Sequence, residues 1–132
     1  MGKFLTSSSE TKQMPEKGMF KLSHNELYKD DDGKIYLAWQ GFRTDHFTWI
    51  RKANWDTRCA HIHDVGCKYH QVVEVLLNDR QLCQLGLLKV VNGDVICKDI
   101  PIHYLKVVDC TGHWINNLFY RMLKSADCPK TP

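Results

Sequence analysis

Hairpin signals and helical periodicities alternate along this chain, and their order limits the folds that it can adopt. The pair Asn92-Gly93 is the strongest hairpin signal, because both residue types accept the positive φ that a two-residue turn needs. Residues 30–33 (D-D-D-G) form a second turn signal between two stretches rich in apolar residues, 19–29 and 34–40. The sequence therefore predicts two β-hairpins, one at each of these turns.

Each hairpin is followed by a stretch in which apolar residues recur at helical spacing. Asn54 is a favourable N-cap for a helix over about residues 55–70. Thr111 can cap a second helix over about residues 112–125. Gly66 inside the first helix costs roughly 1 kcal/mol against alanine, which indicates close backbone approach at that point. This order of elements predicts an α+β fold in which two hairpins and two main helices pack together.

The chain has 132 residues, a length that suits one domain, since domains cluster near ~100–150 residues. Residues 1–18 are polar and rich in serine, so we expect a flexible N-terminal arm there. Residues 19–132 then form a single α+β domain. Stretches of β-branched residues and leucine predict further strands near 72–77 and 102–108.

Charge and hydropathy argue against several classes of protein. The net charge of +3 comes from 18 basic and 15 acidic residues that are interspersed, so nothing motivates nucleic-acid binding. No apolar run approaches the roughly 18–20 residues of a membrane span, and no signal peptide opens the chain. Six cysteines occur without a C-x-x-C pair, so we expect reduced thiols that pack as small apolar groups.

The most unusual stretch is residues 59–70 (C-A-H-I-H-D-V-G-C-K-Y-H), on the first predicted helix. His63 and Cys67 lie one helical turn apart, so they could hold one zinc ion if other segments supply the remaining ligands. The alternative is a stripe that faces the core, in which the cysteines pack and the histidine is hydrogen-bonded. Candidates for the remaining ligands are His46, Cys110 and His113.

The adjacent pair His63-Asp64 has a second interpretation, as part of a catalytic site. A neutral imidazole on a rigid helix can act as a general base on water if another group orients it. Asp45, from the preceding loop, could orient the imidazole or bind a metal ion, although an ion pair with Arg43 would also explain it. The second helix offers Asn116 at the matching position, which is not a carboxylate.

Aromatic residues are dense just before the first helix. They are Phe42, Phe47, Trp49 and Trp55. Aromatic side chains at this density often anchor a protein interface, and a place in the core is the alternative.

Residues 41–45 (G-F-R-T-D), followed by an aromatic loop and then Ala60-x-x-His63-Asp64 on a helix, resemble a phage and prophage family of unknown function. That family carries G-F-x-T-D, then H-D-x-x-Y, then A-D-x-x-F on a later helix; Asn116 stands here in place of the last aspartate. The same helix is similar to the His-Asp helix of secreted and parvoviral phospholipases. That second resemblance implies that His63 is a base and Asp64 a calcium ligand.

Two functions follow as expectations. The first is a phage-encoded, non-enzymatic protein: a virion component or a small module that binds a viral or host protein, in the host cytoplasm or the virion. The alternative is a small metal-assisted hydrolase of esters or amides, with His63 as general base and Asp64 and Asp45 beside it. The sequence identifies no definite cofactor, although these residues could hold zinc or calcium. The sequence specifies no oligomeric state.

Overall fold

A five-stranded antiparallel sheet forms the centre of the protein. The computed structural model describes residues 1–9, 11–15, 18–45 and 55–127. The strands of the central sheet, in spatial order, are β1 (Lys3–Phe4), β4 (Glu26–Lys29), β5 (Ile35–Ala38), β7 (Gln71–Val75) and β10 (Leu105–Asp109). Among the described strands, β10 lies at one edge of this sheet and has β7 as its single neighbour.

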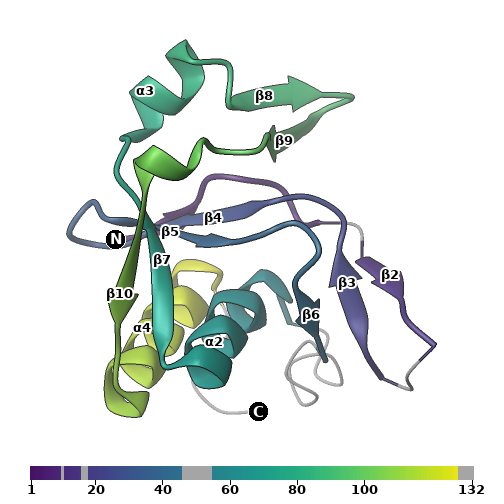
Figure 1. Ribbon diagram of the computed structural model, residues 1–132, viewed down its shortest axis with the longest axis vertical. Helices are drawn as coiled ribbons and strands as arrows, with labels where there is room; N and C mark the ends of the chain where they lie inside the picture. Colours follow the sequence, from purple (N-terminus) through teal and green to yellow (C-terminus); the bar gives the residue numbers. More distant parts are fainter. Residues whose placement is uncertain (10, 16–17, 46–54, 128–132) are drawn as a thin grey trace.

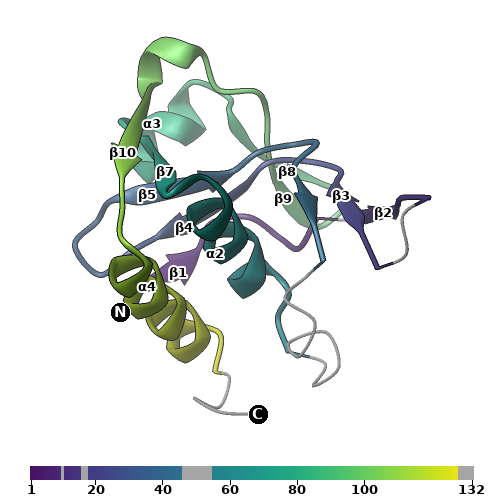
Figure 2. The same ribbon diagram turned by 60° about the horizontal axis from the view of Figure 1, so that its bottom comes forward.

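Two helices cover one face of the sheet, α2 (Arg58–Tyr69) and α4 (Gly112–Ser125). They lie side by side, beneath the sheet in Figure 1 and in front of it in Figure 2. Their apolar sides meet the inward side chains of the strands in one core, which includes Tyr28, Tyr36 and Val72. Gly66 permits the close approach predicted from the sequence, because a Cβ there would lie 2.4 Å from side-chain atoms of Ile115.

The opposite face is covered in part by a short helix, α3 (Asp79–Gln84), and by a hairpin of β8 (Leu88–Val91) and β9 (Asp94–Cys97) (Figure 1). These elements pack on a second cluster of buried residues, which includes Leu37, Val75 and Leu82. A 3-10 turn over Ile102–Tyr104 leads from this layer into β10. The second face is therefore only partly covered, and its β7–β10 end bears exposed side chains.

The fold class is confirmed: the chain is α+β, with antiparallel sheets and helices. Both predicted hairpins form, β4–β5 at residues 30–33 and β8–β9 at Asn92-Gly93, where both residues have positive φ. The second predicted helix occurs as α4, capped by Thr111. The first begins at Arg58, later than predicted. No helix within the described residues is long and apolar enough to cross a bilayer.

The N-terminal residues differ from the expected flexible arm. Residues 3–4 form β1 of the central sheet, and β2 (Thr11–Gln13) pairs with β3 (Phe20–Leu22), which also pairs with β6 (Arg43–Thr44). The backbone N–H of Ser9 donates to Glu26 Oε2 at 2.7 Å, and both residues are buried. Short polar residues can make such contacts, so a polar composition alone did not show that this segment packs.

Candidate functional site

The two segments that carry the sequence resemblance meet in the structure. Strand β6 places Thr44 beside the middle of α2, and the Thr44 hydroxyl donates to Asp64 Oδ2 at 2.5 Å. Asp45, Asp64 and Cys67 line one pocket of about 400 Å³ together with Arg43. Two of the three predicted catalytic residues therefore reach a common pocket, and so does one of the two predicted metal ligands.

His63 lies behind this pocket rather than in its lining. Its side chain is enclosed between α2 and α4, and the residue is only 5% exposed. The His63 ring stacks on Phe119 at 4.5 Å between centroids, and Nε2 donates to Asn116 Oδ1 at 3.0 Å. Nδ1 is 3.9 Å from Asp64 Oδ1. Two neighbours of His63 line the pocket in its place, Asp64 and Cys67.

Cys67 is exposed and lies against the imidazole of His63. Its sulfur is 3.5 Å from Nε2 and 3.9 Å from Nδ1. Partial burial raises the pKa of the Cys67 thiol, and the charges of Asp64 and Cys110 raise it further. Because the thiolate is disfavoured, Cys67 is a protonated thiol at neutral pH.

A metal centre needs more ligands than this site brings together. Among residues 1–9, 11–15, 18–45 and 55–127, no three histidine, cysteine, aspartate or glutamate side chains are arranged to hold a metal ion. Two of the proposed additional ligands, Cys110 and His113, flank the start of α4, and His113 contacts Asn117 at 3.2 Å. The third, His46, lies outside the described residues. The zinc or calcium site therefore stays a prediction.

The four aromatic residues proposed as interface anchors have different positions. Phe42 is buried in the core beneath α2 and α4, where its ring meets Trp39 edge-on at 5.1 Å. Trp55 is half-buried and packs against the same core. Phe47 and Trp49 lie outside the described residues. Phe42 is therefore a core residue, as the alternative interpretation predicted.

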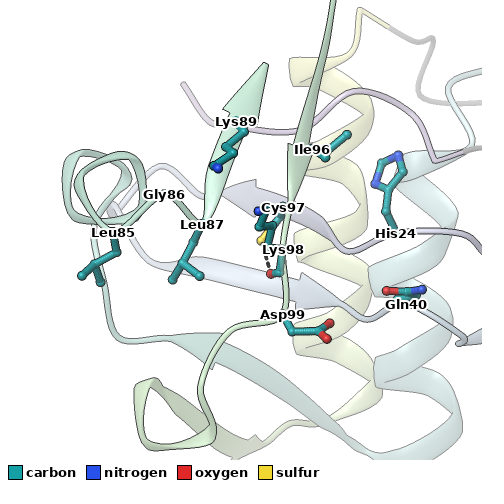
Figure 3. A pocket seen from close by; sticks show the side chains of 10 residues that line it. All are labelled: His24, Gln40, Leu85, Gly86, Leu87, Lys89, Ile96, Cys97, Lys98 and Asp99. Atoms are coloured by element: carbon teal, nitrogen blue, oxygen red, sulfur yellow. Dashed lines mark hydrogen bonds between the residues drawn. The ribbon is translucent and has the colours of Figure 1, made fainter. Parts of the chain in front are cut away.

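A larger hollow, of about 640 Å³, lies away from the His-Asp helix, beside the β8–β9 hairpin. Figure 3 shows Leu85 and Leu87 on one side of it and His24 and Gln40 on the other. Neighbouring Lys89 lowers the pKa of the Lys98 ammonium through a direct contact and like-charge repulsion. None of the residues predicted to form a site lines this hollow.

An apolar groove of about 260 Å³ lies where β7 continues past the end of β5, and the sequence predicted no site there. Trp39 and Tyr69 face each other there at 5.9 Å between ring centroids, beside Val73 and Val107. Val107 is 60% exposed and Tyr69 46%. The groove has one signal in the sequence: Val107 belongs to a short apolar stretch that predicts a strand. Such a stretch does not reveal that the strand lies at the edge of a sheet.

We compared the chain with protein-family models, curated proteins and solved structures. It matches none of them. Its function is therefore inferred from the positions and chemistry of its own residues.

Proposed function

We propose that this protein is a small protein-binding module that takes an extended segment of another protein along the edge strand β10. The observation that carries the proposal is the apolar groove over β7, to which β10 contributes Val107; Val107 is 60% exposed and Tyr69 46%. Exposed apolar side chains next to a sheet edge offer the two parts of strand addition. The backbone edge supplies hydrogen bonds, and Val107, at the rim of the groove, meets an apolar side chain of the ligand.

The edge of β10 is open in the part of the chain that the structure describes. Strand β10 pairs through residues 105–109 with β7, and no other described strand pairs with it. It carries Lys106 near one end and Asp109 at the other, both exposed. The expected ligand is therefore a segment of about five residues with an apolar side chain opposite Val107, an acid near Lys106 and a base near Asp109.

This proposal matches the role that the phage-family resemblance implies: a virion component, or a module that binds a viral or host protein. The enclosed position of His63 supports the non-enzymatic reading, because a general base that activates water must reach the pocket. The metal-assisted hydrolase with His63, Asp64 and Asp45 stays a prediction.

The proposal is tested by selecting binders to the full chain from a random peptide library and measuring their affinity for two variants. Val107→Glu places a charge at the groove, so it should weaken binding by roughly tenfold or more, since most interface energy comes from few central residues. Val90→Glu is the matched control, because Val90 is 72% exposed on β8, away from the groove. The affinity of Val90→Glu for the selected peptides should stay within about twofold of the affinity of the unmodified chain.

Two results would contradict the proposal. One is equal weakening by the two variants. The other is self-association of the chain that Val107→Glu abolishes, because the occupant of β10 would then be a second copy of this chain rather than a partner protein. Analytical ultracentrifugation of both variants separates these outcomes.

A further inference from the structure

The hollow of about 640 Å³ beside the β8–β9 hairpin is not used by the binding function, and one face of the hairpin forms its wall. The strand register places Lys89 opposite Ile96. The next pair continues this register, because the Lys98 N–H donates to the Leu87 carbonyl at 2.8 Å. Alternate residues of a strand point to the same side, so these four side chains share the face that lines the hollow.

Two of the four side chains on this face are lysines, which lie diagonally across the hairpin from each other (Figure 3). The Lys98 ammonium is in direct contact with Lys89, and this contact lowers the pKa of Lys98. Among residues 1–9, 11–15, 18–45 and 55–127, neither lysine forms an ion pair with a carboxylate. Two like charges in contact repel each other, so an anion placed between them would be stabilised by both.

The other titratable groups that line the hollow are His24, Cys97 and Asp99. Burial raises the pKa of the Cys97 thiol to about 12, so it is uncharged at neutral pH. His24 Nδ1 donates to the Asn25 carbonyl at 3.0 Å, which leaves Nε2 for a ligand. Asp99 supplies one negative charge against the two lysines, so the hollow keeps a net positive charge.

Apolar side chains lie next to the lysine pair. Leu85, which is 53% exposed, and the half-buried Leu87 lie on one side of the hollow in Figure 3. The chain passes between them through Gly86, where an added Cβ would lie 3.5 Å from Lys89 Cε. The stem of Lys89 therefore runs over Gly86, which brings its ammonium close to the two leucines. A ligand that matches this arrangement has an anionic group joined to an apolar body.

We propose that this hollow binds a small phosphate monoester with an apolar body. Its phosphate contacts the ammonium groups of Lys89 and Lys98, and its apolar body lies against Leu85 and Leu87. A phosphate monoester carries nearly two negative charges at neutral pH and three acceptor oxygens, so it can accept from both lysines at once. Asp99 repels the phosphate from its own end of the hollow, which orients the ligand. The site is separate from the edge of β10.

The test is a titration of the isotope-labelled full chain with phenyl phosphate, followed by amide NMR shifts. We expect shifts at residues 85–89 and 96–99 that saturate with a Kd of about 1 mM or tighter. Benzyl alcohol, which has a ring and no charge, and inorganic phosphate, which has no ring, should each bind several-fold more weakly. Sodium chloride at the same ionic strength should not reproduce the shifts, because screening acts on every exposed charge.

Three variants at exposed positions separate the two parts of the site. Lys98→Gln removes one charge, so it should weaken the binding of phenyl phosphate and of inorganic phosphate by about five- to tenfold. Leu85→Ala should weaken phenyl phosphate by about threefold and leave inorganic phosphate unchanged. Lys34→Gln is the matched control, since Lys34 precedes β5 whereas Gln40 of the hollow follows it. Its affinity should stay within about twofold of the unmodified chain.

The pKa of Lys98 provides a second readout, because a bound phosphate should raise it in the unmodified chain. Val107→Glu should bind phenyl phosphate as the unmodified chain does, so failure of this site and failure of peptide binding at β10 can be told apart. Three results would each overturn the proposal: no saturation by about 10 mM phenyl phosphate, equal weakening by Lys98→Gln and Lys34→Gln, or shifts that sodium chloride reproduces.

Discussion

At the scale of single residues, the most consequential contact is a buried pair between β4 and α2. The carboxylate of Glu26 accepts from His61 Nδ1 through Oε1, and it accepts the Ser9 N–H at 2.7 Å through Oε2. Glu26 and His61 are 1% and 0% exposed. One carboxylate thus joins the sheet, the helix and the N-terminal segment.

We predict that Glu26→Ala lowers the free energy of unfolding by about 3–5 kcal/mol, the usual cost of removing one member of a buried pair. Glu26→Gln should lose less, because the amide oxygen can still accept the Ser9 N–H. Urea denaturation gives both values. Glu74→Ala is the control, at a half-buried position on β7, and should change stability by about 1 kcal/mol or less. A loss that small in Glu26→Ala would show that the pair contributes little.

Cys97 makes the stability of the protein depend on pH in the alkaline range. Burial raises the pKa of its thiol to about 12, from an ordinary value of 9.0. Between these pH values the unfolded chain releases a proton that the folded chain retains. The Cys97 thiol therefore leaves the free energy of unfolding undiminished below pH 9.0 and lowers it as pH rises towards 12.

Replacing Cys97 with alanine should therefore flatten the decline in stability above pH 9.0, measured by urea denaturation in the presence of a reductant. Burial also raises the pKa of Tyr28 and Tyr36, but these residues are present in both proteins and cancel in the difference. The control Cys83→Ala, at an exposed position, should show the same decline in stability with pH as the unmodified protein. The same slope in Cys97→Ala as in the unmodified protein would contradict the assignment.

At the scale of elements, the contact between α2 and α4 determines where His63 and Asn116 meet. Gly66 allows it, because an added Cβ would lie 2.4 Å from Cδ1 and Cγ1 of Ile115, a fully buried side chain. A β-branched side chain in a helix has essentially one rotamer, so Ile115 cannot turn aside.

Gly66→Ala should therefore destabilise the protein by about 1–3 kcal/mol despite the higher helix propensity of alanine, as overpacking of a core does. Ile115→Ala in the same chain should remove part of the clash, so the double variant should lose less than the sum of the two single losses. Gly112→Ala is the matched control, since a Cβ there meets nothing within 4 Å. A stabilised Gly66→Ala would show that the helices adjust freely.

Local signals predicted the elements that depend on neighbours in sequence. The Asn92-Gly93 turn and the apolar periodicity of α4 are complete within a few residues, and both were confirmed. Helix α3 was missed because only Leu82 of its six residues is buried, although the capping box formed by Asn78 and Gln81 is readable in the sequence.

The candidate site was predictable only in part, for a different reason. His63, Asp64 and Cys67 stand together in sequence, so one helix places them near each other. Their contacts with Thr44 and Asn116 join residues 20 and 53 positions apart in the chain. Such contacts depend on how strands and helices pack, which single-sequence periodicity does not specify.

At the scale of the whole molecule, the sheet is covered unevenly. Helices α2 and α4 cover one face, whereas α3 and the β8–β9 hairpin leave the β7–β10 end of the other face open (Figure 1). The apolar groove and the edge of β10 occur together at this end. Natural sheets usually blunt an open edge, so an apolar groove near this edge supports the proposed binding role.

We propose that this end of the sheet is the binding surface. A titration of the isotope-labelled full chain with a library-selected peptide, followed residue by residue by amide NMR shifts, tests this. We predict the largest shifts at residues 105–109 and around Tyr69, with slower amide exchange along β10. Largest shifts in the pocket beside Asp64, or in the hollow between β8–β9 and His24, would contradict the claim.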